Sequence, residues 1–219
     1  MVLDKRLRPY RRTDWRDHLA KSSPWKVYET SSARHEFLRC LFGMLDRVWL
    51  GGIYDSGKPH HAPNFKQVYE WMSVPMLPSR CAAGTFKKGS HQRSQGNVRT
   101  NPLIVIESDN MQGFNPATPS EKEANKASSF ALIQYLRDKW KLNLRAVVDT
   151  GNKSLHAWFD HPSSHIMDCL IDMAWSHHID EGLLTHCQAL PLRMPGCIHE
   201  KTNIRAELLY LNHNQQHQY

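Results

Sequence analysis

The chain has 219 residues, of which 40% are hydrophobic and 22% are charged, and this length suits one globular domain built as two lobes. No segment approaches the ~18 consecutive apolar residues of a membrane helix. The basic start of the chain also lacks the apolar core of a secretory signal. Five cysteines without a Cys-x-x-Cys pair are typical of reduced thiols in a cytoplasmic protein.

The net charge of +7 is divided unequally along the chain. Residues 1–100 hold 18 Lys and Arg against 8 Asp and Glu, whereas residues 101–219 hold 10 against 13. A basic half beside an acidic half is typical of a protein whose first half binds a polyanion and whose second half gathers carboxylates. A basic surface that only keeps the protein soluble is the alternative.

Helices are predicted in the first half of the chain. Thr13 is a good cap for a short helix over 13–21. Apolar residues at helical spacing predict a longer helix over 31–50, which a pair of glycines would end. A third helix, also short, is expected over 65–72.

A basic loop over 86–99 precedes the acidic half. It is rich in glycine and in hydroxyl side chains and carries Lys87, Lys88 and Arg93. Backbone amides in such loops, together with cationic side chains, suit contact with phosphate. A connector without a ligand is the alternative.

An apolar run over 103–106 leads directly into Glu107 and Asp109. The run reads as a buried strand. Side chains two residues apart on a strand point to the same face, so the two carboxylates are expected side by side. Their repulsion has to be neutralised, and a divalent cation with oxygen ligands would do so. A strand that simply ends in solvent is the alternative.

The rest of the second half alternates predicted helices and strands. The helix after the acids begins with a cap, a proline in the first turn and an acid three residues on. A Gly-containing turn joins the next two strands into a hairpin. The predicted helices lie over 118–141 and 162–177, and the predicted strands lie over 144–149, 154–159 and 207–211.

The hairpin and a later segment carry groups that suit phosphate. Lys153 lies in the turn, and Ser154 and His156 share one face of the return strand. A histidine on a strand is more often structural. The segment 192–202, which reads LRMPGCIHEKT, supplies four further donors.

Taken in order, these features resemble the archaeo-eukaryotic primase superfamily, the primase–polymerases of plasmids, phages, archaea and eukaryotes. Its acid-x-acid motif on an apolar strand is matched by Glu107 and Asp109, with Glu where Asp is more frequent. Its Ser-x-His motif after a Gly turn is matched over 154–156. Its third motif, an apolar residue followed by Asp, precedes a run that residues 192–202 resemble. The resemblance covers residues from about 100 to 211.

The resemblance implies a metal site of three acids. These are Glu107, Asp109 and Asp180, and the third is assigned by spacing. Such a site holds two Mg²⁺ or Mn²⁺ ions that clamp the attacking hydroxyl and the leaving pyrophosphate in nucleotidyl transfer. Other acids near the third position are rivals for it: Glu181, Asp172 and Asp168.

The resemblance also implies the partners, which are a single-stranded DNA template, a primer and an NTP or dNTP. His156 is expected in the catalytic set as well as at the nucleotide. The residues expected to bind the triphosphate are Lys153, Ser154, His156, Arg193 and Lys201. The residues expected to bind nucleic acid are Lys87, Lys88, Arg93 and His199.

The implied fold is α+β and forms a single catalytic domain over 1–219. An RRM-like antiparallel sheet with helices would occupy about 101–219, flanked by a basic N-terminal α/β lobe over about 1–100. The sequence has no Gly-x₄-Gly-Lys-Ser/Thr loop, so a separate or fused helicase would unwind duplex DNA. A prokaryotic cytoplasm in a plasmid or phage context is expected.

Two other functions fit part of the pattern. A non-catalytic replication initiator on an RRM-like sheet explains the charge and the aromatic residues, but it does not explain the ordered acids. A metal-dependent nuclease or other phosphotransferase also uses clustered acids, although the Ser-x-His strand fits a triphosphate better than a diester. A structural Zn²⁺ is a lesser alternative, with these ligands: His186, Cys187, Cys197 and His199.

Overall fold

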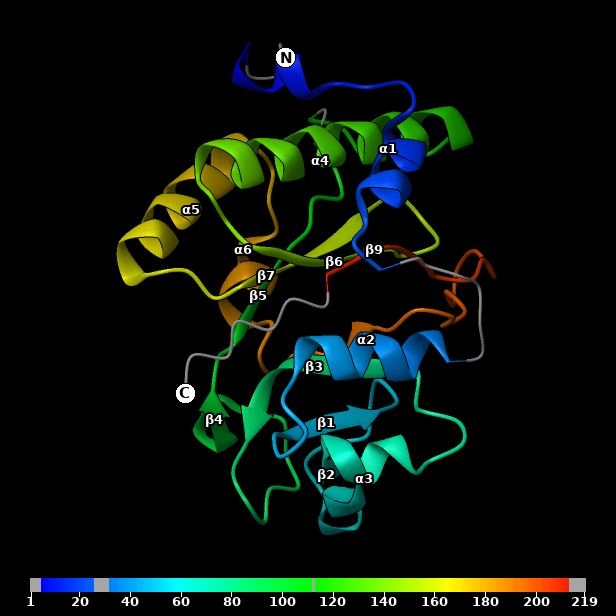
Figure 1. The fold of residues 1–219 in the computed structure, drawn as a ribbon, viewed down its shortest axis with the longest axis vertical. Coiled ribbons are helices and arrows are strands. Elements are labelled where there is room, and N and C mark those ends of the chain that lie inside the picture. Colours follow the sequence, from blue (N-terminus) through cyan, green and yellow to red (C-terminus); the bar gives the residue numbers. More distant parts are fainter. Residues whose placement is uncertain (1–4, 26–31, 112, 213–219) are drawn as a thin grey trace.

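The computed structural model describes residues 5–25, 32–111 and 113–212. The protein is a mixed α and β fold in which two antiparallel sheets lie one above the other along the long axis (Figure 1). The expected class, α+β with antiparallel sheets and helices, is confirmed. Among the helices in these ranges, none combines the length and apolarity that crossing a membrane requires.

The four-stranded sheet carries most of the elements predicted for the second half. Its order is β5-β7-β6-β9, and every neighbouring pair is antiparallel. The last strand lies beside β6, whereas in the split β-α-β order of an RRM-like sheet the last strand pairs with the first. The strands of this sheet are β5 (Leu103–Ile106), β6 (Leu144–Asp149), β7 (Leu155–Asp160) and β9 (Glu207–Leu211).

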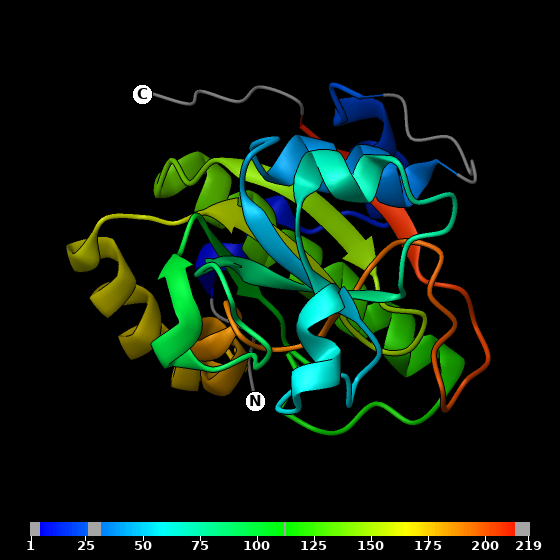
Figure 2. The ribbon, with the colours of Figure 1, turned by 90° about the horizontal axis from the view of Figure 1, so that it is seen from below.

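The five-stranded sheet is formed mostly by the first half of the chain. Its order is β2-β1-β3-β4, and the short strand β8, which comes from the second half, pairs with β3. The view along the long axis shows α2 and α3 side by side across this sheet (Figure 2). Its strands are β1 (Arg47–Gly51), β2 (Phe65–Gln67), β3 (Arg80–Phe86), β4 (Val98–Thr100) and β8 (Leu192–Arg193).

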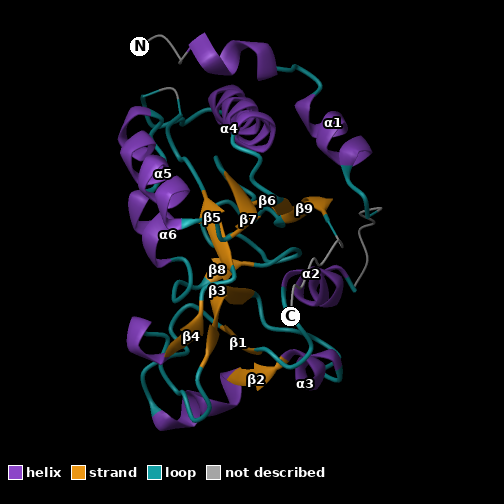
Figure 3. Cartoon of the chain, turned by 60° about the vertical axis from the view of Figure 1, so that its left-hand side comes forward, coloured by secondary structure: helices purple, strands orange, loops and turns teal. Residues whose placement is uncertain are grey.

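Helices cover the outer face of the four-stranded sheet. The helix α4 begins with the predicted capping box, in which Thr118 accepts from the backbone of Glu121 and the Glu121 carboxylate accepts in return. The helices α5 and α6 lie along the β5 side (Figure 3). The helical elements are η1 (Lys5–Tyr10), α1 (Trp15–Ser22), α2 (Ala33–Leu41), η2 (Pro59–Asn64), α3 (Val68–Met72), η3 (Gln95–Asn97), α4 (Pro119–Lys139), α5 (Ser164–Ser176) and α6 (Glu181–His186).

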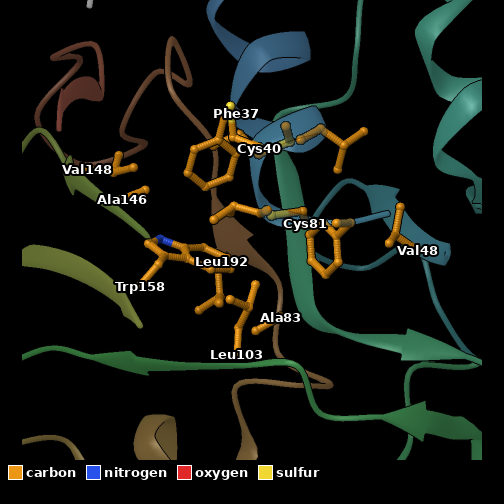
Figure 4. Close-up of a cluster of buried hydrophobic side chains, with 14 of the residues drawn as sticks. Phe37, Cys40, Val48, Cys81, Ala83, Leu103, Ala146, Val148, Trp158 and Leu192 are labelled. Atoms are coloured by element: carbon orange, nitrogen blue, oxygen red, sulfur yellow. The ribbon is translucent and has the colours of Figure 1, made fainter. Parts of the chain in front are cut away.

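A continuous apolar core joins the two sheets. Leu103 and Trp158 face inward from the four-stranded sheet and meet Ala83 and Leu192 of the other sheet (Figure 4). Phe37 of α2 packs edge-on against Trp158, with ring centroids 5.2 Å apart. Because one core serves both sheets, the two lobes are packed as one unit.

The helix predicted over 31–50 is wrong beyond Leu41. Residue 31 lies outside the described residues, α2 ends at Leu41, and β1 begins at Arg47. The apolar spacing continues through this segment, but Gly43 and Asp46 form a turn in which the Gly43 amide donates to the Asp46 carboxylate over 2.8 Å. The turn exposes residues 44 and 45 and starts a strand.

Other predicted boundaries also change. The helix predicted over 65–72 is correct only for its second part, because residues 65–67 pair with β1 as strand β2. The lobes do not divide the chain at residue 100. Leu7 and Trp15 from the first half join the apolar core that α4 forms with the four-stranded sheet, and β8 from the second half joins the other sheet.

The shared core predicts one cooperative unfolding transition. Replacement of Phe37 by Ala should lower the free energy of unfolding by about 3–5 kcal/mol, the usual cost of removing a buried aromatic side chain. Urea denaturation followed by tryptophan fluorescence and by far-UV circular dichroism measures it. Two separate transitions in the wild type, or a loss below about 1 kcal/mol, would contradict a shared core.

Candidate functional site

The pairing of β5 with β7 places Glu107 opposite His156. Ile106 pairs with Ala157, so the next antiparallel partners in register are Glu107 and His156. Directly opposite residues share one face, and here it is the face toward the five-stranded sheet, where Trp158 also lies. The acid and the histidine are therefore brought together by strand register.

The carboxylate of Glu107 is mostly buried and meets two donors. The Ser154 hydroxyl donates to Oε1, and Nε2 of His156 lies 3.3 Å from the same oxygen. Burial alone would raise the pKa of Glu107, but the charge and hydrogen bond of His156 act against burial. The hydrogen bond from Ser154 and the charge of Arg193 act in the same direction, so the pKa is lowered overall.

Asp109 lies two residues beyond Glu107, in the loop after β5, and is about half exposed. Its Oδ2 is 3.0 Å from Nζ of Lys153, which also donates to Asn115 over 2.8 Å. The turn that carries Lys153 requires Gly151, whose φ is +81° and whose added Cβ would come within 2.8 Å of the Ile204 carbonyl oxygen. The acid loop and the hairpin turn thus meet through an ion pair.

Asn125 of α4, which the sequence analysis did not identify, connects the same two segments. Its side-chain amide donates to the carbonyls of Ser108 and Lys153 over 3.0 and 2.8 Å. Its Oδ1 accepts from the Met111 amide over 2.7 Å. The side chain is buried, and both its amide hydrogens and its oxygen form hydrogen bonds that fix the loop against the turn. No local pattern marks an asparagine in the middle of a helix for this role.

A buried ion pair anchors the other end of the turn. Asp149 accepts from Lys126 over 2.8 Å, from Arg16 over 2.6 Å and from the Gly151 amide over 3.0 Å. Burial raises the pKa of Asp149, but these partners outweigh burial and lower it below 3.8. The helix side of the sheet is therefore held by structural charges, separate from the Glu107 side.

Asp180 lies at the N-terminus of α6, beside a pocket of about 330 Å³ that Asp109 also lines. Its Oδ1 accepts from the Leu183 amide over 2.8 Å, so it caps the helix. Its backbone amide donates to the Glu107 carbonyl over 2.9 Å. Glu181 lines the same pocket, whereas the other two rivals, Asp168 and Asp172, lie exposed on α5.

The cationic side chains and the histidine of the segment 192–202 differ in exposure and in partners. Arg193 lies close enough to Glu107 to lower its pKa, and its Nη2 is 2.7 Å from Oε2 of Glu200. Lys201 is exposed. His199 is buried, and its Nδ1 accepts from the Lys201 amide over 3.1 Å, so the expected contact of this ring with nucleic acid is not supported.

The basic loop divides into exposed and engaged cations. Lys87 and Lys88 are exposed, and Lys87 donates to the Gly96 carbonyl over 2.7 Å. Arg93 lies over the Trp49 ring at 4.3 Å and donates to the Ala189 carbonyl over 2.9 Å. Its position holds the loop to the sheet, whereas Lys87, Lys88 and Arg99 are exposed.

The three acids offer oxygen ligands for a divalent ion but are not gathered into one cluster. Among the described residues, no group of three or more His, Cys, Asp or Glu side chains lies close enough together to hold a metal ion. Neither the three acids nor the four suggested zinc ligands therefore form such a group. Each of the three acids uses one carboxylate oxygen in the contacts given above, and its other oxygen takes part in none of those contacts. The acids are Glu107, Asp109 and Asp180. The hard oxygen donors of Glu107 and Asp109 fit Mg²⁺ or Mn²⁺.

Comparison with models of known protein families finds no match for this chain, and comparison with curated proteins finds none. Among solved structures, the fold is similar to the AEP domain of the primase-polymerase of cyanophage S-2L. The TM-score is 0.42 at 12% sequence identity, and the match covers 84% of this chain and 91% of that chain. A likeness at this TM-score does not indicate a function.

The buried pair under the turn predicts a pH-dependent stability. Replacement of Asp149 by Asn should cost about 3 kcal/mol at pH 7, because Lys126 then stays buried without its partner. Since the pKa of Asp149 is depressed in the folded protein, the difference from wild type should be complete above its ordinary value of 3.8 and shrink as pH falls below it.

Urea denaturation of both proteins between pH 7 and pH 3 measures this difference. The Asp168→Asn variant is the control, because Asp168 lies exposed on α5. A difference that stays constant as pH falls would contradict the assigned role of the Asp149 carboxylate.

Proposed function

We propose that the protein is a metal-dependent nucleotidyltransferase of the primase–polymerase kind, which transfers a nucleotide from NTP or dNTP to a strand paired with a DNA template and releases pyrophosphate. One observation supports it most. The carboxylates of Glu107 and Asp109 lie directly beside Lys153, Ser154 and His156, at the ends of neighbouring strands. Acids for a metal and donors for phosphate are then within reach of one substrate.

In this proposal the acids hold the divalent ions. Glu107 and Asp109 would supply their free oxygens, and Asp180 would join from the far side of the pocket. The bound ions would supply Lewis-acid stabilisation of the charge that develops on the transferring phosphoryl group. Ser154 and His156 keep Glu107 ionised and oriented by donating to its other oxygen.

The cations of the site would bind the triphosphate. Lys153 reaches Asp109 from the turn and would exchange this contact for a phosphate oxygen when the nucleotide binds. Arg193 lies on the opposite sheet, with Lys201 exposed in the same segment. A triphosphate held between these groups would lie between the two sheets, with its reacting end beside the acids.

A template assay tests the proposal directly. The protein is given a DNA template with and without a primer, in Mg²⁺ or Mn²⁺, and each nucleotide pool in turn. Template-dependent strand growth that requires both metal and triphosphate is expected. Degradation of the template would indicate a nuclease instead. Template binding without synthesis under every condition would indicate a non-catalytic binding protein, and either result would overturn the proposal.

Asp109→Ala should abolish strand extension and leave the fold intact. Asp109 is about half exposed, so loss of its ion pair with Lys153 should change stability by less than about 1 kcal/mol. Primer extension and thermal melting measure the two effects. Asp138→Ala is the matched control, because Asp138 has the same exposure, 52%, and also contacts a lysine. Extension at near wild-type rate would remove Asp109 from the metal site.

His156→Ala should lower kcat/KM for the nucleotide by about ten- to a few-hundredfold, the range for loss of a charge-assisted hydrogen bond at a buried acid. Ser154→Ala should act in the same direction but less, because its hydroxyl is neutral. Template Kd should stay unchanged in both. If activity per folded molecule is unchanged and only the melting temperature falls, His156 is a packing residue.

Replacement of Lys87 and Lys88 together by Ala should weaken DNA binding for all sequences alike. Each cation that contacts phosphate releases counterions, so the slope of log K against log salt should fall by roughly one to two units. The matched control replaces two exposed lysines, Lys139, which ends α4, and Lys141, two residues beyond it. An equal change in slope for both pairs would show that only the net charge matters.

A further inference from the structure

Two arginines face each other on the five-stranded sheet. Arg80 on β3 and Arg193 on β8 are direct partners in the antiparallel register. Like charges directly opposite each other are destabilising unless an anion lies between them. The side chain of Arg80 is almost fully buried, and one of its amino groups donates to the Pro191 carbonyl over 3.0 Å. The pair therefore presents its remaining donors at a fixed place.

The carboxylate of Glu200 bridges the pair. Oε2 is 2.7 Å from Nη2 of Arg193, and Oε1 contacts Nη2 of Arg80. Hydrogen bonding from Arg193 contributes most to lowering the pKa of Glu200 to about 2, and Arg80 adds to it. The Glu200 side chain is nevertheless 56% exposed and comes from a surface turn. The carboxylate of Glu200 thus occupies the anion-binding site that the two arginines form, and it enters this site from the solvent side.

The site has capacity that Glu200 does not use. The Nε atom of Arg193 is buried and has no hydrogen-bond partner among the described residues. A phosphate group carries more than one negative charge and three acceptor oxygens, and the fork of a guanidinium fits it in two-point contact. A phosphate could therefore satisfy both arginines better than one carboxylate does.

We propose that Arg80 and Arg193 form a polyphosphate-binding site, which Glu200 occupies in the free protein and which the triphosphate of the incoming nucleotide takes over. The identity of the ligand as a nucleoside triphosphate rests on the proposed function. The charge of Arg193 acts on Glu107, so the arginine pair and the proposed metal site would meet the same substrate. Arg80 becomes a further nucleotide-binding residue. Glu200 becomes a competitor, because the apparent affinity for triphosphate is the intrinsic affinity multiplied by the fraction of the time that Glu200 leaves the site free.

Binding of inorganic triphosphate, measured by calorimetry without metal, tests this inference apart from any catalysis. Glu200→Gln removes the competing charge and should tighten binding by about three- to tenfold. Glu200→Asp keeps the charge but shortens the reach, so it should tighten binding less. Arg80→Gln in the Glu200→Gln background should cancel the gain. Melting temperatures confirm that each variant is folded.

Glu207→Gln is the matched control, because it removes the carboxylate of another exposed ion pair, with Arg16. Equal tightening by this control would mean that only net charge matters and would overturn the inference. Unchanged or weaker triphosphate binding in Glu200→Gln would do the same. Tighter binding of a short single-stranded DNA alone would assign the arginines to backbone phosphates instead. Strand extension by the wild type would remain a separate result in every case.

Discussion

Burying the carboxylate of Glu107 is the constraint on which the arrangement of the site depends. A buried charge is costly unless donors meet it, and two donors meet this one. His156 of β7 faces Glu107 in register, and Ser154 immediately precedes β7. The cost is thus offset by the same side chains that would meet a triphosphate. One consequence is that Ser154 and His156 cannot be judged as phosphate donors alone, because both already contact the acid.

The acid loop and the hairpin turn are held rigidly on one side and left open on the other. Asn125 fixes both backbones from α4, and Asp149 anchors the start of the turn. On the opposite side, the ion pair between Asp109 and Lys153 is partly exposed, and Arg193 approaches from the other sheet. A rigid base beneath exchangeable ion pairs suits a site that binds charged substrates and releases them.

The sequence predicts those parts of the fold that depend on interactions between residues close together in the chain. The capping box of α4, the Gly151 turn and the alternation of β7 depend on neighbours in sequence, and the structure has them where expected. The end of α2 was missed because its apolar spacing continues past the turn at Gly43. The roles of Asn125 and Arg80 were also missed, since each depends on partners more than ten residues away, which no local pattern reveals.

Paramagnetic broadening by Mn²⁺ tests most directly whether the two segments form one site. The protein is labelled with ¹⁵N, and amide signals are followed by NMR as Mn²⁺ is added with and without a nucleoside triphosphate. Signals from residues 107–110 and 153–156 should weaken first, and the nucleotide should sharpen that selectivity and extend it toward Arg193. Broadening centred elsewhere, or spread evenly over the acidic surface, would contradict a metal-dependent nucleotide site at Glu107 and Asp109.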